Sequence, residues 1–319
     1  MTQLANSDTN YLEGFFPGSA FTDEHQLTQL RMLAKRLRLA SLPQIHGMLA
    51  GGHASKQKGR GLDLDQLRQY LPGDDIRTID WRVTARTQTP HTRVYKEERE
   101  RPVVIVCDQR TPMAFGSQRS FKSVVAAQCA AIIAWAALDH GDRVGAFILG
   151  DDDEQDFRPK QRAQHVLQIL RAINDFNHRL KQHKTVKNSL SDCLKKLHKG
   201  VKPGTSIYII SDFFDLSEQD KAALFNLKRH NHVVALQVYD ALERKMPPPG
   251  MYAVTDGVNE GFLDTQSKQS QSAYQEAVNV FQQGIEQTFK QLAINHHQID
   301  ATDIPYMALK IALEQRGAK

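Results

Sequence analysis

Residues 102–108 read Pro102-Val103-Val104-Ile105-Val106-Cys107-Asp108, an unbroken apolar run that ends in a carboxylate, and this stretch decides the fold. A strand that is buried on both faces of a parallel sheet has such a continuous apolar pattern, because neither of its faces meets water. The stretch therefore predicts the first strand of a central parallel sheet, with Asp108 at its carboxyl end.

The sequence after this strand alternates between expected helices and expected strands. The expected helices cover residues 121–138, 161–176, 190–198 and 218–229, and the expected strands cover residues 143–149, 206–210 and 232–239. Such alternation implies right-handed crossovers and a mainly parallel sheet with helices on both faces, so the predicted fold class is α/β. After Pro247-Pro248-Pro249 we expect short strands, a polar helix over 269–292 and a last strand over 298–301.

The N-terminal third is less regular. Residues 1–22 show no clear period and are expected to form a mobile or loosely docked leader. Leucines recur at helical spacing over 23–49, which predicts an amphipathic helix that Pro43 ends or bends. The glycine-rich stretch 47–61 lacks the Gly-Lys-Ser/Thr order of a phosphate-binding loop and is expected to be a connector. Short strands are expected over 79–85 and 92–95.

These patterns divide the chain into four regions. They are a leader (1–22), an N-terminal helix with a β-rich insert (23–101), an α/β domain (102–250) and a C-terminal α/β extension (251–319). A chain of 319 residues can bury an ample core without covalent cross-links.

Composition favours a cytoplasmic protein. The three cysteines, Cys107, Cys129 and Cys193, form no Cys-x-x-Cys pair, so neither a disulfide framework nor a zinc site is expected. The N-terminus lacks the basic start and apolar run of a secretory signal. The longest apolar stretch, 124–138, falls short of the roughly 20 residues that cross a bilayer, so we expect a buried helix and no transmembrane segment.

The net charge of +5 is unevenly distributed, with basic runs at 31–38, 56–60 and 77–101. Acids interleave with the third run and are expected to pair with it internally. The first two runs leave nucleic-acid binding open as an alternative function. The acidic run from Asp151 to Glu154 is expected to be a solvated loop.

Residues 61–86, GLDLDQLRQYLPGDDIRTIDWRVTAR, closely resemble the signature of the bacterial family called domain of unknown function 58. The matching positions are Arg68, Tyr70, Pro72, Gly73, Asp74, Asp75, Arg77, Asp80, Trp81 and Arg86. The resemblance implies a β-rich elaboration on a von Willebrand factor A-like domain. It also implies a role as partner or substrate adaptor of a MoxR-type AAA+ ATPase that acts on an unidentified client protein.

The acids of the signature have two interpretations. Asp74, Asp75 and Asp80 are close enough in sequence to form a catalytic carboxylate cluster. The favoured interpretation is structural, because arginines at positions 68, 77, 82 and 86 can pair with these acids and brace the turn. Trp81 is expected to alternate with its neighbours in a strand and to pack between the insert and the main domain, rather than to stack on a ligand.

The von Willebrand A resemblance implies a metal site at the carboxyl edge of the sheet, built from Asp-x-Ser-x-Ser, a Thr and a second Asp. Here the first motif reads Asp108-Gln109-Arg110-Thr111-Pro112, so both serine positions lack an oxygen ligand suited to the ion. Asp212 matches the second Asp, with Asp215 nearby, and either Thr185 or Ser189 matches the Thr. We hypothesise that Arg110 takes the cation's place and pairs with Asp108 or Asp212. We expect no cofactor, and Mg²⁺ held by Asp108 and Asp212 stays as the alternative.

The predicted function is therefore a non-enzymatic protein-interaction module. Its contact surface is either the face that carries Asp108, Arg110, Pro112, Asp212 and Asp215 or the insert at 74–86. A metal-dependent phosphoesterase that uses the three aspartates is the rival from another class, because carboxylates can hold metals and move protons.

Overall fold

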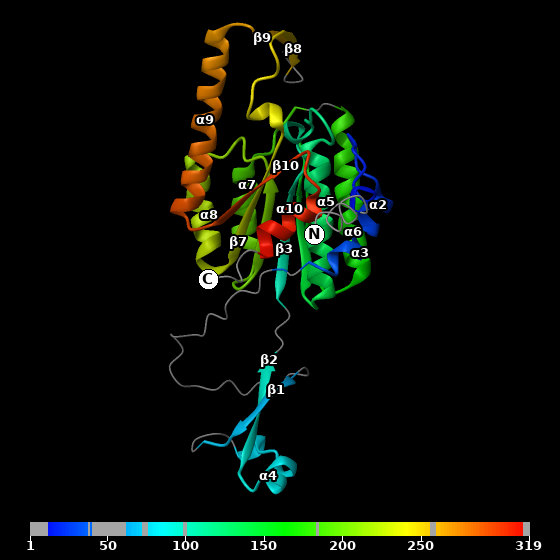
Figure 1. Ribbon diagram of the computed structural model, residues 1–319, viewed down its shortest axis with the longest axis vertical. Helices are drawn as coiled ribbons and strands as arrows, with labels where there is room; N and C mark the ends of the chain where they lie inside the picture. Colours follow the sequence, from blue (N-terminus) through cyan, green and yellow to red (C-terminus); the bar gives the residue numbers. More distant parts are fainter. Residues whose placement is uncertain are drawn as a thin grey trace, which may run out of the picture. The chain divides into compact units, whose positions relative to one another are not determined.

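The computed structural model describes residues 12–37, 39, 62–71, 76–97, 101–182, 185–255 and 260–314. These residues divide into two compact units (Figure 1). The larger unit comprises the described residues of 12–39 and 101–314, and the smaller unit comprises those of 62–97.

The larger unit contains a six-stranded sheet in the order β10-β7-β6-β3-β4-β5. Its strands are β3 (Pro102–Asp108), β4 (Arg143–Leu149), β5 (Glu154–Lys160), β6 (Ser206–Ser211), β7 (His232–Tyr239) and β10 (Asn295–Asp300). All neighbouring pairs are parallel except β4 with β5. The predicted α/β class with a mainly parallel sheet is confirmed.

Strand burial explains which strands were predicted from the sequence. Strand β3 is buried from Val103 to Asp108, and β6 is buried throughout, as their apolar runs indicated. The antiparallel edge strand β5 was not predicted, because its sequence is polar and partly exposed. A side chain at Gly145 would place a Cβ 2.5 Å from the backbone oxygen of Phe157 on β5. Glycine at this position therefore allows the edge strand to lie close to β4.

The helices cover both faces of the sheet (Figure 1). One face packs against α2 (Glu24–Gln29), α3 (Arg31–Ala34), α5 (Lys122–Asp139), α6 (Ala163–Arg179) and α10 (Pro305–Glu314), and the other against α7 (Leu190–Gly200), α8 (Glu218–His230) and α9 (Lys268–Gln291). Most of these helices bury one stripe, as α6 does with apolar side chains at helical spacing. A hairpin of β8 (Met251–Thr255) and β9 (Glu260–Asp264) precedes α9.

Helix α5 is the exception, because it is buried almost all round. Among the described residues it is the one helix long and apolar enough to cross a membrane, but most of it lies inside the larger unit. A helix that is apolar on every side is typical of the interior of a protein. The prediction of a buried core helix here is confirmed.

The leader prediction is wrong for residues 12–22, and positions 1–11 lie outside the described residues. Leu12 and Phe16 are buried in the core, and the Thr22 N–H donates to Asn177 Oδ1 at 2.8 Å. The single long helix expected over 23–49 is replaced by the short helices α2 and α3, and residue 43 lies outside the described part. Burial of two large apolar side chains holds this segment against the rest of the larger unit.

The smaller unit pairs β1 (Leu62–Gln69) with β2 (His91–Glu97) in an antiparallel ladder, which confirms the strand expected over 92–95. Between them lie a 3-10 turn, η1 (Ile76–Thr78), and α4 (Trp81–Thr87). The strand expected over 79–85 is therefore wrong. The reason is local: Asp80 Oδ1 accepts the N–H groups of Arg82 and Val83, which caps a helix.

The smaller unit contains the described residues of the family signature at 61–86. Trp81 begins α4 and is 66% exposed, so the prediction that it packs in strand fashion is wrong. Arg68 belongs to β1, the Tyr70 N–H donates to the backbone oxygen of Pro90, Arg77 lies in η1, and Arg86 lies in the last turn of α4. Positions 72–75, which hold Pro72, Gly73, Asp74 and Asp75, lie outside the described residues.

Candidate functional site at the carboxyl edge of the sheet

Polar side chains gather where the parallel strands β3, β6 and β7 end. Asp108 is the last residue of β3, Ser211 ends β6 and is followed by Asp212, and Asp240 follows β7. The carboxyl ends of parallel strands meet at one edge of a sheet, which is the usual place for a binding site in α/β folds. The sequence places three buried carboxylates at this edge.

Arg110 and Asp108 form a buried bidentate ion pair. Arg110 Nε donates to Asp108 Oδ1 at 3.0 Å, and Nη2 donates to Oδ2 at 2.7 Å. The backbone N–H of Arg110 also donates to Oδ1, and the hydroxyl of Ser211 donates to Oδ2 at 2.7 Å. The Arg110 side chain is only 3% exposed. Both oxygens of Asp108 are therefore satisfied inside the protein.

The same guanidinium reaches two further loops. Its Nη1 donates to Asp215 Oδ2 at 2.5 Å and to the backbone oxygen of Asn188 at 3.2 Å, and Nη2 donates to Asp215 Oδ1 at 3.0 Å. Asp215 Oδ2 also accepts the N–H of Leu190, the first residue of α7. Arg110 thus joins the loop after β3, the segment before α7 and the loop after β6.

The charges in this cluster stabilise one another. Burial alone would lower the pKa of Arg110, but Asp108 and Asp215 together hold it above the ordinary value. Burial would likewise raise the pKa of Asp215, and the hydrogen bonds and charge of Arg110 outweigh this effect and lower it. Paired groups whose charged forms are mutually favoured stay ionised. The site is a preorganised cluster of fixed charges.

A second buried cation holds Asp212. Lys122, in the first turn of α5 and 1% exposed, donates from Nζ to Asp212 Oδ2 at 2.8 Å and to Glu243 Oε1 at 2.5 Å. Burial works against the charge on this lysine, but Asp212 and Glu243 more than offset it, so its pKa lies above the ordinary value. The remaining oxygen of Asp212, Oδ1, accepts the N–H of Phe214.

Two other carboxylates order the surrounding loops. Asp240 accepts the backbone N–H and the hydroxyl of Ser117, at 2.8 and 2.6 Å. Asp151 accepts the N–H and the hydroxyl of Thr111, at 2.7 and 2.8 Å. The expectation of a solvated acidic loop at 151–154 is therefore wrong, because Asp153 also pairs with Arg179 and Glu154 with Lys196.

The structure brings together some of the predicted site residues and separates others. Arg110 pairs with Asp108 and with Asp215, whereas Asp212 pairs with Lys122 instead. Pro112 lies in the 3-10 turn η2 (Thr111–Met113) and offers no ligand atom. Thr185 is exposed, and Ser189 caps α7 by accepting the N–H of Asp192.

Sequence reasoning missed Ser211, Lys122, Glu243 and Asp240. Two of them carried a usable signal. Lys122 is a charged residue at the start of an otherwise apolar helix, and Asp240 directly follows a buried strand. Burial of a charge requires a partner, so each pointed to a carboxylate or a donor nearby.

The side chains at this edge do not fit the metal that a von Willebrand A resemblance implies. Both oxygens of Asp108 and both of Asp215 accept from the Arg110 guanidinium, and Arg110 and Pro112 replace two oxygen ligands. Within the part of the chain that the structure describes, no group of three or more His, Cys, Asp and Glu side chains is arranged to hold a metal ion.

Comparison with known proteins gives the family. A family model described as protein of unknown function DUF58 matches residues 66–283. The chain belongs to this family. The resemblance drawn from residues 61–86 to DUF58 is thereby confirmed.

Relatives of this DUF58 chain include two mycobacterial proteins. They are uncharacterized protein Rv1480 of Mycobacterium tuberculosis and uncharacterized protein Mb1516 of Mycobacterium bovis, each 28% identical over 228 residues, which is 72% of this chain and 71% of the relative.

Two solved structures resemble the DUF58 chain distantly. The conserved hypothetical protein BatB from Bacteroides thetaiotaomicron is 10% identical with a TM-score of 0.38 and matches 67% of this chain and 98% of its own. An aerotolerance-related membrane protein from Bacteroides fragilis is 14% identical with a TM-score of 0.41 and matches 67% of this chain and 97% of its own. At these TM-scores neither resemblance defines the fold more closely.

Proposed function

We propose that this DUF58 chain is a non-enzymatic protein-interaction module built on a von Willebrand A-like domain, and that it serves as partner or adaptor of a MoxR-type AAA+ ATPase in the cytoplasm. The main support for this proposal is the exposure of Phe214. Its side chain is 70% exposed, on a loop that the buried charge clusters hold at the sheet edge. The identity of the ATPase rests on the family resemblance alone.

The loop that carries Phe214 is held in a strained conformation. Phe213 has φ of 57°, a left-handed backbone that bulky residues rarely adopt. Such strain persists only where the surroundings fix it. Here the Phe213 N–H donates to Ser211 Oγ, and its buried ring packs edge-on against Phe289 with centroids 5.0 Å apart. The loop therefore presents Phe214 in a fixed position.

The surroundings of Phe214 suit a protein partner. Its ring lies 5.7 Å from that of Phe281, beside a cavity of about 230 Å³ whose lining includes Tyr239 and Tyr274. Glu243, with a side chain 35% exposed, adds a carboxylate to the rim. Aromatic anchors next to an apolar pocket with a polar rim are typical of the centres of protein interfaces.

The rival functions receive less support. A phosphoesterase needs carboxylates free to bind a metal or move a proton, but Asp108 and Asp215 are paired with Arg110, and Asp212 is paired with Lys122. For nucleic-acid binding, Arg31 is paired with Asp139 and lies over the Trp135 ring, and the run 56–60 lies outside the described residues.

The smaller unit offers a second contact surface for the same function. Trp81 and Ile76 are both mostly exposed, at 66% and 62%. Tryptophan is enriched among the residues that dominate binding energy at interfaces. The test therefore includes a variant in each unit.

The test is affinity purification of the tagged chain from its own host, with and without ATP, followed by mass spectrometry and a nucleic-acid stain. We expect an AAA+ ATPase in the eluate of the wild type, and about tenfold less with Phe214→Ser, because loss of an anchoring aromatic costs on the order of 1.4 kcal/mol or more. The matched control is Phe225→Ser, which removes a 56% exposed phenylalanine from α8 and should change nothing.

Loss of the ATPase in Trp81→Ser but not in Phe214→Ser would move the contact to the smaller unit. Recovery of nucleic acid alone, or of nothing, would contradict the adaptor function.

A further inference from the structure

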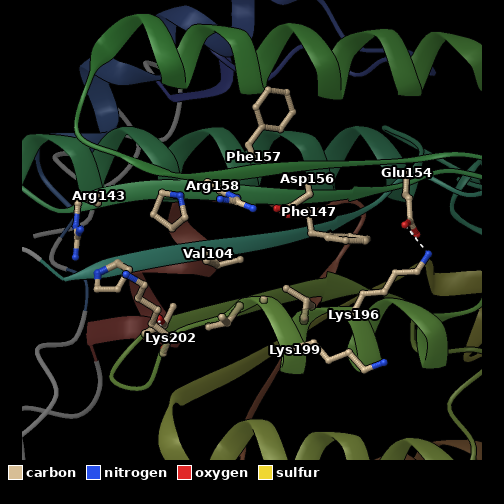
Figure 2. Close-up of a pocket in the computed structure, with 16 residues that line it drawn as sticks. Val104, Arg143, Phe147, Glu154, Asp156, Phe157, Arg158, Lys196, Lys199 and Lys202 are labelled. Atoms are coloured by element: carbon tan, nitrogen blue, oxygen red, sulfur yellow. Dashed lines mark hydrogen bonds and ion pairs between the residues drawn. The ribbon is translucent and has the colours of Figure 1, made fainter.

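A groove of about 640 Å³ lies away from the edge site, on the face of the sheet beside α7 (Figure 2). Its size is in the range of about 300–1,000 Å³ that ligand sites occupy. One wall comes from β5 and the other from the C-terminal half of α7 and the loop to β6. The groove runs from the Glu154–Lys196 ion pair, at one end of β5, toward Arg143 at the start of β4 (Figure 2).

Both faces of the sheet carry a buried core, and the groove lies on the α7 side, between β5 and the C-terminal half of α7. On β5, the Phe157 side chain points toward the covering helices (Figure 2). There its ring packs edge-on against that of His165, with the centroids 5.9 Å apart. Alternate residues of a strand point to opposite faces. Glu154 and Asp156 therefore share the groove side, and Arg158, which lies beyond an irregularity in the pairing of β4 with β5, also lines the groove.

The charges of the groove are mostly positive. Its lining holds five basic and two acidic residues: Arg143, Arg158, Lys196, Lys199 and Lys202, with Glu154 and Asp156. Glu154 is already paired with Lys196, at 2.5 Å. Arg158, Lys199 and Lys202 are exposed and form no ion pair with any residue that the structure describes. Three cations on two facing walls are thus available to a ligand.

The floor of the groove is apolar. Val104, Phe147 and Leu197 are buried beneath it, and Val201 and Pro159 lie at its sides. An apolar floor between basic walls is complementary to a chain that alternates apolar and acidic side chains, since such a chain in extended form directs them to opposite sides. This combination of an apolar floor and basic walls favours such a chain over other anionic ligands.

We infer that this groove binds an extended acidic segment of a partner protein, with its carboxylates on Arg158, Lys199 and Lys202 and its apolar side chains on the floor. A nucleic acid fits less well, because Glu154 and Asp156 would face a continuous row of phosphates along the β5 wall. The basic side chains also come from both walls rather than converging on one point, as a single phosphate would require.

The groove is separate from the Phe214 surface. Peptide binding in the groove does not depend on the function proposed for the Phe214 surface. Helix α7 contributes to both surfaces. The N–H of its first residue, Leu190, donates a hydrogen bond to Asp215, and its C-terminal half lines the groove. The two surfaces therefore require separate variants in the test.

The test is selection of a displayed library of random short peptides on the full chain, with counter-selection on Lys199→Glu/Lys202→Glu. We expect enriched peptides that alternate acidic and apolar residues. In fluorescence anisotropy, a selected peptide should bind Lys199→Glu/Lys202→Glu about tenfold or more weakly than the wild type. Arg158→Glu, on the opposite wall, should weaken binding in the same direction.

The matched control is Lys195→Glu/Lys221→Glu, which makes the same change of net charge at two lysines outside the groove that form i,i+3 pairs on α7 and α8. This control and Phe214→Ser should both bind the peptide as the wild type does. The inference is overturned by a lack of enrichment, by equal loss in the control, or by tighter binding of oligo(dT) or phosphatidylglycerol vesicles that depends on the same lysines.

Discussion

Replacing Arg110 with methionine is expected to lower the free energy of unfolding of the larger unit by about 3–5 kcal/mol, because it leaves a buried charge without its partner. Asp108 is fully buried and would keep only the Ser211 hydroxyl and a backbone N–H as donors. Asp215, which is partly exposed, would lose its ion pair at a smaller cost. The loss also removes the contacts that join three loops.

The measurement is urea unfolding followed by tryptophan fluorescence in a Trp81→Phe background. The chain has two tryptophans, and Trp135 is buried in α5, so it then reports on the larger unit alone. Arg171→Met is the matched control. Arg171 pairs with Glu24 on the surface, and such pairs contribute about 0–1 kcal/mol. A loss for Arg110→Met no larger than that of the control would contradict the structural role given to the arginine.

Replacing Lys122 with methionine is also expected to cost about 3–5 kcal/mol, since Asp212 would then be a buried carboxylate without its cation. Glu243 is more exposed and can be hydrated when its partner is removed. The double variant Lys122→Met/Asp212→Asn should recover part of this loss, because it no longer buries an unpaired charge.

The same tryptophan signal measures both variants. A double variant as unstable as the single one would show that the loss comes from packing around the lysine stem and not from the charge on Asp212. That result would contradict the role given to the Lys122–Asp212 ion pair.

The sequence of helices and strands in the larger unit was predictable, because buried parallel strands and their covering helices have distinct apolar patterns. Strand β3 and helix α5 are examples. Strand β5 was missed because an edge strand with one solvated face has no such run. Helix α4 was mistaken for a strand because one capping side chain, Asp80, outweighed a short alternating pattern.

The edge site was predictable only in part. The motif at 108–112 identified Asp108 and the loss of two oxygen ligands, and the hypothesis that Arg110 pairs with Asp108 agrees with the geometry. Asp212 and Asp215 lie in the same loop after β6, and which of them meets Arg110 depends on the path of that loop, which no local pattern encodes. Lys122 comes from a separate element, so its contact with Asp212 depends on tertiary packing.

The most direct test of the central claim, that Arg110 and not a metal organises the edge face, is equilibrium dialysis of the purified chain against Mn²⁺ as a probe for divalent ions. We predict no stoichiometric binding at the edge site in the wild type and no difference between the wild type and Asp108→Ala. Binding of a single Mn²⁺ per chain that is lost in Asp108→Ala would contradict the claim and favour the metal-dependent phosphoesterase.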